Sequence, residues 1–254
     1  MTKGFHDKSR QVLRIGGADR VKFLQDLVTN DVSGLKNGPV YAALLSPKGK
    51  YLFDFFLIAD GDDILLDVDM ARAQALAQRL MMYRLRADVT IEADDLAVWR
   101  GVGDFPTGAV TDPRNLAMGW RFYGAALTVD SMEPAEFDAL RIENVIPETE
   151  LLPDETYILE AGFERLNGVD FRKGCYVGQE ITARMKHKTE LKKGLARVSV
   201  TGDSQPVGTA ITANDKVVGT LFTNLNGFGI AQLRFDRATG DMQAGTAILR
   251  LIKA

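Results

Sequence analysis

The chain has 254 residues, a length that suits one or two domains, and its 46% of hydrophobic and 26% of charged residues are ordinary for a globular protein. Lysine and arginine number 31 against 34 aspartate and glutamate residues, so the net charge is −3, which argues against a general nucleic-acid binder. One cysteine excludes an intrachain disulfide. With two histidines it cannot complete the usual four-ligand zinc site, so we expect no resident metal.

The N-terminal segment and the hydropathy pattern bear on the location of the protein. Residues 1–8 lack the apolar core of a secretory signal, and the sequence shows no Arg/Ser-rich amphipathic leader. No stretch reaches about 18 apolar residues, so we expect no membrane segment. We therefore predict a cytoplasmic protein.

The N-terminal part of the chain mixes strand and helix patterns. Apolar residues recur at helical spacing after Asp19, which is placed to cap a helix that ends at Asn30 and Asp31. Proline and glycine in Pro47-Lys48-Gly49-Lys50 favour a tight turn between two strands. The order of strands, helix and strand predicts mixed α+β layers. The elements expected here are strands at 41–46, 51–59 and 64–69, a helix at 71–85 and extended chain at 89–91.

The middle of the chain is less regular, and its C-terminal part changes character. Residues 101–106 and 111–114 are typical of loops, and an early proline opens a short helix at 134–142. From Lys193 onward, short runs of Val, Ile, Leu and Thr are separated by glycines, which predicts a small all-β barrel or sandwich. We therefore expect two domains, at 1–190 and 191–254.

The most unusual segment runs from Arg172 to Glu180 and contains the one cysteine, Cys175. Arg172 and Lys173 favour a thiolate over a thiol, and Gly174 permits a tight turn that would expose the sulfur. Such a thiolate could be a transient metal ligand, a redox switch or a nucleophile. The alternative is a small buried residue at a loop–helix junction, since free cysteines are among the most buried residues. An iron–sulfur cluster ordinarily needs about four thiolates, so this chain alone is not expected to hold one.

Two carboxylates and a basic run are further candidates. Asp54 interrupts an apolar strand, where it needs hydrogen-bond partners or a polar ligand unless it points outward from an edge strand. Glu143 raises the same question at the end of a helix. The basic run from Arg184 to Lys193 is either a solvated loop or a site for an anion.

These segments carry a resemblance to a known family. Lys173-Gly174-Cys175-Tyr176-Val177-Gly178-Gln179-Glu180 resembles the signature of the YgfZ family of folate-binding proteins, which are relatives of the T-protein (aminomethyltransferase) of the glycine cleavage system. Three other segments are similar to that family: residues 23–32, which include the Thr29-Asn30-Asp31 stop of its first helix, the hairpin turn Ser46-Pro47-Lys48-Gly49-Lys50, and the helix-to-strand junction Tyr83-Arg84-Leu85-Arg86-Ala87-Asp88-Val89. The resemblance covers most of residues 20–200 and continues weakly beyond.

The resemblance implies a T-protein-like α+β body, with mixed antiparallel sheets and helices, followed by a C-terminal β-barrel. It implies tetrahydrofolate or another folate as cofactor, and as partners the iron–sulfur assembly machinery or client proteins with [4Fe–4S] centres, such as radical-SAM enzymes. Glu143 would hold the pterin ring, because a carboxylate accepts two adjacent N–H donors, and Asn30, Asp54 and Arg84 would line the same pocket. The functional motif would comprise Lys173, Gly174, Cys175, Tyr176, Gly178, Gln179, Glu180 and Arg184.

Three functions follow as hypotheses, and whether the protein is an enzyme stays open. The first is a tetrahydrofolate-binding accessory protein that supports iron–sulfur cluster assembly or repair through Cys175, with Lys173 and Arg184 keeping the thiol anionic or orienting a partner. The second is a folate-dependent aminomethyltransferase with Asp54 as its acid. The T-protein has two adjacent acids where this chain has Phe53-Asp54, which disfavours transfer. The third is a binding or scaffold module with a vestigial pocket, which would work through contact with assembly partners. We favour the first.

Overall fold

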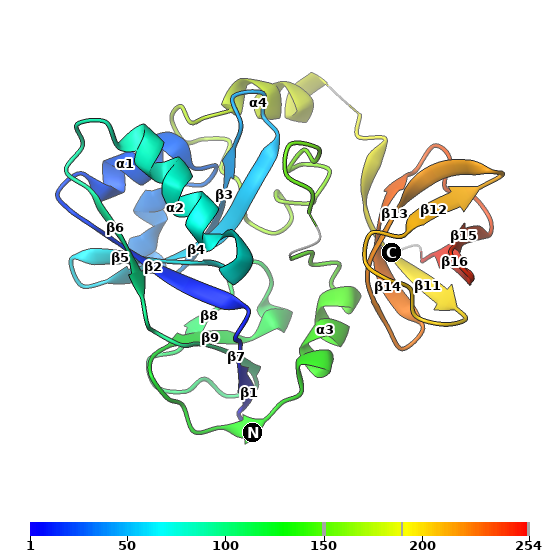
Figure 1. Ribbon diagram of the computed structural model, residues 1–254, viewed down its shortest axis with the longest axis horizontal. Helices are drawn as coiled ribbons and strands as arrows, with labels where there is room; N and C mark the ends of the chain where they lie inside the picture. The colour runs from blue at the N-terminus through cyan, green and yellow to red at the C-terminus, as the bar shows by residue number, and fades with distance from the viewer. Residues whose placement is uncertain (149–150, 189, 253–254) are drawn as a thin grey trace.

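The computed structural model describes residues 1–148, 151–188 and 190–252. Within these ranges the chain forms two five-stranded sheets, four α-helices and a closed barrel of six strands. Figure 1 shows the barrel at one end of the molecule and the two sheets with most of the helices at the other. The α+β class and the C-terminal barrel predicted from the sequence are confirmed.

The first sheet is antiparallel, with strand order β3-β4-β5-β2-β6. Helices α1 (Arg20–Leu27) and α2 (Met70–Arg84) cover one face of it and bury Leu24, Leu76 and Leu80 completely. The strands of this sheet are β2 (Arg10–Gly16), β3 (Val40–Leu45), β4 (Tyr51–Asp60), β5 (Asp63–Asp69) and β6 (Thr90–Asp94). Strands β3, β4 and β5 are near-continuous apolar runs because both of their faces are covered, whereas the edge strand β6 is largely exposed.

One detail of the predicted first helix is wrong. Asp19 occupies the position before α1, but its side chain makes no capping hydrogen bond to that helix. Its Oδ2 instead accepts the backbone N–H of Asp88 at 2.8 Å, which ties the start of α1 to the segment after α2. A short 3₁₀ helix, η1 (Val32–Asn37), follows α1, and there the Asp31 side chain does cap, accepting the N–H of Ser33 at 3.0 Å.

The second sheet has the order β10-β1-β7-β9-β8 and was not predicted. The predicted loop at 101–106 is wrong in its first residues, because Gly101 lies in β7. A Cβ atom at Gly101 would lie 2.2 Å from the Trp120 ring, so this strand needs glycine to admit the indole. The strands are β1 (Lys3–His6), β7 (Val98–Val102), β8 (Val110–Thr111), β9 (Trp120–Tyr123) and β10 (Asp130–Ser131).

Two α-helices and a 3₁₀ helix lie between this sheet and the rest of the molecule. The 3₁₀ helix η2 (Leu116–Met118) precedes β9, and α3 (Pro134–Glu143) lies beside the barrel, where it packs against β13. Helix α4 (Gln179–Lys188) lies near the β3–β4 hairpin, as Figure 1 shows, and leads into the barrel. None of the helices in the described ranges is long and apolar enough to span a membrane.

The barrel closes in the order β11-β14-β13-β12-β15-β16. Val198, Leu221 and Leu249 are among the fully buried side chains of its separate core. Glycines between the strands permit the tight turns that the sequence pattern indicated. The strands are β11 (Lys193–Thr201), β12 (Ala210–Ala213), β13 (Lys216–Leu225), β14 (Phe228–Arg234), β15 (Met242–Ala244) and β16 (Ala247–Leu251).

Candidate functional site

Cys175 lies on the loop before α4 and is an exposed free thiol. Its neighbour Gly174 is surrounded by open space, and the Arg172 side chain is 93% exposed. The loop is nevertheless held on both sides, because Tyr176 is buried and Gln179 Nε2 donates to the Gly174 carbonyl at 3.3 Å. The buried alternative for this cysteine is therefore wrong, and the sulfur sits at an exposed tip of an anchored loop.

Lys173 anchors this loop to the end of α1. Its ammonium donates to the carbonyl oxygens of Gln25 at 2.7 Å, Val28 at 2.5 Å and Asn30 at 3.1 Å. An ammonium has three protons, and all three are taken by these carbonyls. Burial lowers the pKa of Lys173 to about 8. The Lys173 side chain therefore points into the protein and holds the loop, and its three protons are engaged by carbonyls and not by the Cys175 thiol.

The segment before the cysteine loop is fixed by Thr29 and Asn30. The Thr29 hydroxyl donates to the Gly168 carbonyl at 2.7 Å, and its own carbonyl accepts the N–H of Asp170 at 3.1 Å. Asn30 Nδ2 donates to the carbonyl of Asn167 at 2.6 Å. These bonds join residues that are well over a hundred positions apart in the chain, so the cysteine loop rests on the end of α1.

The other side of the loop packs on the β3–β4 turn. A Cβ atom at Gly178 would lie 2.7 Å from the Ser46 carbonyl, and one at Gly49 would lie 2.7 Å from the Cβ atom of Ile181. Both glycines have positive φ, +81° and +71°. The three segments at 29–31, 46–50 and 173–180 therefore converge on one site, where two glycines permit backbone contact that no side chain would allow.

This close contact gives a matched pair of substitutions. Gly178→Ala is expected to lower the free energy of unfolding by about 1–3 kcal/mol, because Cβ would meet the backbone at a positive φ. Gly174→Ala, four positions earlier, is expected to change it by less than about 0.5 kcal/mol, because its Cβ meets nothing within 4 Å. Urea unfolding of both variants measures the difference. Equal effects would show that the loop does not dock as described.

Asp54 lies on β4, which is flanked by β3 and β5, so it is not on an edge strand. Its carboxylate accepts the hydroxyl of Tyr41 at 2.9 Å and that of Tyr51 at 2.5 Å, and Arg72 donates to the Tyr51 oxygen at 2.7 Å. Burial, reinforced by the nearby carboxylate, raises the pKa of both tyrosines well above their usual range, so they remain donors. The carboxylate has partners on both oxygens, as an interior strand demands.

The four residues expected to bind folate do not line one pocket. Asn30 and Asp54 are linked through Tyr41, because Asn30 donates to its carbonyl and the Tyr41 hydroxyl donates to Asp54. Glu143 lines a different cavity, between α3 and the barrel. Arg84 lies at the end of α2 and lines a groove of about 410 Å³ with α1, which we call the α1–α2 groove and which shares no residue with the Glu143 cavity.

The Glu143 cavity has a volume of about 690 Å³, within the range of small-molecule sites. Glu143 is exposed, so its carboxylate is accessible. Two guanidinium groups also line the cavity: Arg165, which donates to the carbonyl of Asn144 at 2.9 Å, and Arg197, whose Nε is buried without a hydrogen-bond partner. The apolar part of the lining comprises Val145, Leu195, Ala196, Phe235, Leu251 and Ile252.

The rest of the basic run and motif lies on α4. Gln179 and Glu180 open this helix as expected, and Glu180 lies in its first turn, where a carboxylate favours the positive helix end. Arg184 is exposed on the same helix. The predicted basic loop is thus helical up to Lys188, and residue 189 lies outside the described residues.

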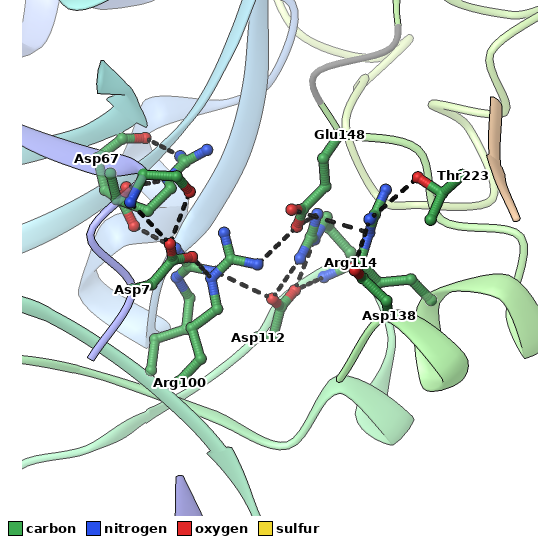
Figure 2. A network of polar contacts seen from close by, with 12 residues as sticks. Asp7, Asp67, Arg100, Asp112, Arg114, Asp138, Glu148 and Thr223 are labelled. Carbon is green, nitrogen blue, oxygen red and sulfur yellow. Dashed lines mark hydrogen bonds and ion pairs between the residues drawn. The ribbon is translucent and has the colours of Figure 1, made fainter. Parts of the chain in front are cut away.

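A buried network of arginines and acids, absent from the sequence predictions, lies between the two sheets (Figure 2). Arg100 pairs with Asp7 at 2.7 Å and with Glu148 at 2.8 Å, and Arg114 joins Glu148 at 3.0 Å to Asp112 at 2.8 Å. The alternating charges satisfy one another in an interior that would otherwise reject them. In order, the chain of ion pairs runs through Asp7, Arg100, Glu148, Arg114, Asp112, Arg121, Asp67 and Arg10.

The network reaches both ends of the molecule. The carboxylate of Asp67 on β5 forms an ion pair with Arg10, with Nε and Oδ1 2.7 Å apart, and a second ion pair with Arg121 of the second sheet. On the barrel side, Arg141 of α3 pairs with Asp138 at 2.8 Å and donates to the Thr223 hydroxyl of β13 at 3.4 Å. The only sequence signal was a charged residue inside an apolar strand, as in Ile64-Leu65-Leu66-Asp67-Val68.

The network predicts how stability depends on pH. Burial alone would raise the pKa of Asp67, but Arg10 and Arg121 outweigh it and lower this pKa to about 2. The pKa of Glu148 is also held well below its usual range, against burial, by Arg100. Unfolded carboxyls titrate near pH 4, so the stabilisation is present above about pH 4 and lost as pH falls towards about 2.

An acid titration followed by tryptophan fluorescence measures this, because Trp120 is fully buried beside the network. We expect unfolding between about pH 4 and pH 2. A midpoint above about pH 5 would mean that the carboxylates do not carry these shifts.

Comparisons with known proteins identify both the barrel and the fold of the whole chain. Residues 192–254 match the family model of the C-terminal beta-barrel domain of CAF17. The whole fold is similar to the crystal structure of the glycine cleavage system aminomethyltransferase T from Bartonella henselae, with a TM-score of 0.79, 14% identity, and coverage of 100% of this chain and 85% of that one. The protein therefore has a T-protein-like fold that ends in a CAF17-type barrel.

Two relatives identify the family. The chain is 29% identical to the mitochondrial iron–sulfur cluster assembly factor IBA57 of Mus musculus, over 98% of this chain and 82% of that protein. It is 30% identical to the same factor of Homo sapiens, over 94% of this chain and 79% of that protein. The chain belongs to the IBA57 family of iron–sulfur cluster assembly factors, which supports the YgfZ resemblance at the level of the wider family.

The same comparisons show that the predicted cytoplasmic location is wrong. The relatives from mouse, human and Pyricularia oryzae are all named as mitochondrial proteins. The prediction rested on the absence of a leader pattern, and the fold, composition and charge suit either compartment, so none of them could correct it.

Proposed function

We propose that this protein supports the assembly or repair of iron–sulfur clusters, especially [4Fe–4S] clusters, with Cys175 as its one thiolate ligand to a cluster in transit. The observation that carries the proposal is the exposed Cys175 at the tip of a loop that Lys173 and Gly178 anchor. The relatives are named as assembly factors for such clusters. An exposed thiol on an anchored loop suits a ligand that binds a cluster and then releases it to another protein.

The number of thiolates that this chain can supply limits how it can bind a cluster. A cluster is ordinarily held by about four thiolates. In the described part of the chain, no group of three or more His, Cys, Asp or Glu side chains is placed to hold a metal ion. Cys175 would therefore supply one ligand, and the assembly machinery or the client protein would supply the others. The cluster is cargo in this proposal, and its transfer needs no other group of this chain.

We further propose that tetrahydrofolate, a carrier of one-carbon groups, binds in the Glu143 cavity. The residues present fit it. Glu143 offers an exposed carboxylate to the N–H donors of a pterin edge. Arg165 and the unpaired Nε of Arg197 suit the anionic glutamate tail, and the apolar lining suits the rings between them. In this arrangement Asn30, Asp54 and Arg84 do not touch the folate.

Calorimetric titration with tetrahydrofolate tests the folate proposal. The parent protein is expected to bind saturably, and Glu143→Ala to weaken binding by at least about tenfold. Glu92→Ala, which removes an exposed carboxylate on β6, is the matched control and should bind like the parent. Absence of binding to the parent removes the folate proposal, and equal binding by Glu143→Ala moves the site elsewhere.

The cluster proposal is tested separately, in cells that lack their own factor of this family. Expression of this protein in the mitochondria is expected to restore the activity of [4Fe–4S] enzymes, which an empty vector does not. The aminomethyltransferase alternative gains no support from the site, because both oxygens of Asp54 are engaged by tyrosine hydroxyls.

A further inference from the structure

Helices α1 and α2, whose residues line the α1–α2 groove, lie at the end of the molecule opposite the barrel (Figure 1). Phe23 and Leu27, which are 7% and 6% exposed, belong to α1 and contribute an apolar floor. Tyr83 and Leu85, at the end of α2, form part of the wall. A groove of about 410 Å³ with such a lining is the right size for one or two large apolar side chains.

Exposed apolar side chains occur on the elements that form the groove. Leu85, which lines the groove just after α2, is 87% exposed. Val21 of α1 is 44% exposed, and Met82 and Met81 of α2 are 70% and 43% exposed. Methionines adapt their shape to a partner and are common at binding surfaces.

Leu85 also holds a strained backbone. Its φ of +45° and ψ of −106° lie outside the regions that a bulky residue adopts easily. Strain of this kind persists in folded proteins where the surroundings impose it, and it concentrates at binding sites. No burial within this chain compensates it, because the side chain is almost fully exposed. A glycine would fit this backbone better, so the exposed leucine side chain is compatible with a contact made outside the chain.

Hydrogen bonds tie the wall of the groove to the start of α1. The backbone N–H of Asp88 donates to the Asp19 carboxylate at 2.8 Å, and the N–H of Asp19 donates to the Asp88 carbonyl at 3.0 Å. Gly17 permits this approach, since a Cβ atom there would lie 2.2 Å from the Asp88 oxygen. The segment that carries Leu85 is therefore tied to the start of α1, and a ligand would meet a preformed site.

The charged side chains that line the groove are three cations, Lys22, Arg84 and Arg86, and two carboxylates, Asp19 and Asp26. Asp26 pairs with Lys22 at 2.5 Å, whereas Asp19 keeps its negative charge because its donor is a neutral backbone N–H. In the described ranges Arg86 enters no ion pair, and the Arg84 guanidinium donates one hydrogen bond, to the Val89 carbonyl at 3.3 Å. A partner that approaches this groove is thus favoured if it brings carboxylates.

We propose that the α1–α2 groove docks an acidic amphipathic segment of a partner protein. Apolar side chains of that segment would enter the groove between Phe23 and Leu85, and its carboxylates would meet Arg84 and Arg86. This is the helix-in-groove mode of recognition, in which a few apolar anchors give affinity and charge gives specificity. The surface is distinct from the Glu143 cavity and does not depend on the proposed chemistry of Cys175.

Fluorescence anisotropy with two labelled peptides tests the proposal. The first is an amphipathic peptide of about 14 residues with leucines on one helical face and glutamates on the other. The second has lysine in place of each glutamate. The acidic peptide is expected to bind the full-length protein saturably, and the basic peptide at least about tenfold more weakly. Failure of the acidic peptide to bind, or equal binding of both, overturns the proposal.

Variants locate the binding. The double charge reversal Arg84→Glu/Arg86→Glu and the single change Leu85→Gly are each expected to weaken the acidic peptide by about tenfold or more. Lys216→Glu, an exposed charge reversal in the barrel, should leave binding unchanged. Leu85→Gly should not lower the thermal unfolding temperature, because glycine adopts the positive φ without strain. Unchanged peptide binding, or a marked loss of stability in Leu85→Gly, would show that Leu85 serves the fold instead.

Discussion

Cys175→Ser is expected to abolish the support of [4Fe–4S] enzymes in cells while the protein stays folded. The side chain is exposed, and serine differs from cysteine by one atom, so the free energy of unfolding should change by less than about 0.5 kcal/mol. A serine hydroxyl, however, does not replace a thiolate as a soft ligand to iron. The activity of the client enzymes should therefore fall to that of cells with an empty vector.

The control for this variant is another exposed side chain, and Glu92→Ala on β6 serves. Both variants must accumulate to the level of the parent, which a blot of the same cells measures. Full activity with Cys175→Ser would refute a role for the thiol in cluster transfer. Loss of the folded protein would make Cys175 a structural residue, in conflict with its exposure.

The parts of the fold that could be predicted from the sequence are those set by local pattern. The turn at 47–50, the strands on either side of it and helix α2 follow from turn residues, apolar runs and helix formers close together in the chain. The second sheet could not be predicted, because its strands are short and carry glycines that read as loop. Gly4 and Gly101 are glycines because the Trp120 ring packs on them, which only the tertiary structure reveals.

In the candidate site, too, local sequence pattern predicted some features and long-range contacts determined others. The residue types of the 173–180 segment predicted a tight turn before a helix but left open whether Cys175 is exposed or buried, and the structure shows it exposed on the loop before α4. The partner of Lys173 could not be inferred, since its ammonium reaches carbonyls 143 to 148 residues earlier in the chain. Because Lys173 is next to the cysteine in the sequence, it suggested an electrostatic effect on the thiol. In the structure its ammonium instead supplies the donor that three carbonyls at the end of α1 need.

The buried ion pairs explain how such distant parts hold together. Asp67 lies in the first sheet, Arg121 in the second, and Arg141 reaches from α3 to the barrel. Each ion pair needs its two partners at contact distance, so these pairs add a geometric constraint to the apolar packing between the bodies. The Cys175 loop rests on α1 and on the β3–β4 turn, so the first sheet is its platform.

Asp67→Ala is expected to lower the free energy of unfolding by about 3–5 kcal/mol, a large share of the 5–15 kcal/mol typical of a domain. The substitution removes the carboxylate that Arg10 and Arg121 share and also leaves the Tyr123 hydroxyl without its acceptor at 2.9 Å. Both guanidinium groups would remain in the interior, because burial is imposed by the surrounding sheets. The cost comes from uncompensated charge and not from lost packing, since alanine removes few apolar contacts.

Asp60→Ala is the control, because it removes an exposed ion pair and so shows how much of the Asp67→Ala effect is due to burial. Asp60 pairs with Arg14 at 2.7 Å, but its side chain is 48% exposed, so water replaces the lost partner and the effect should be below about 1 kcal/mol. Urea unfolding of the two variants gives the comparison. Asp67→Asn, which keeps the shape, should fall between them, because an amide oxygen still accepts a hydrogen bond while its charge is gone. If Asp67→Ala cost no more than Asp60→Ala, the arginines would have to reach water in the variant, and the two sheets would then be held together by apolar packing alone.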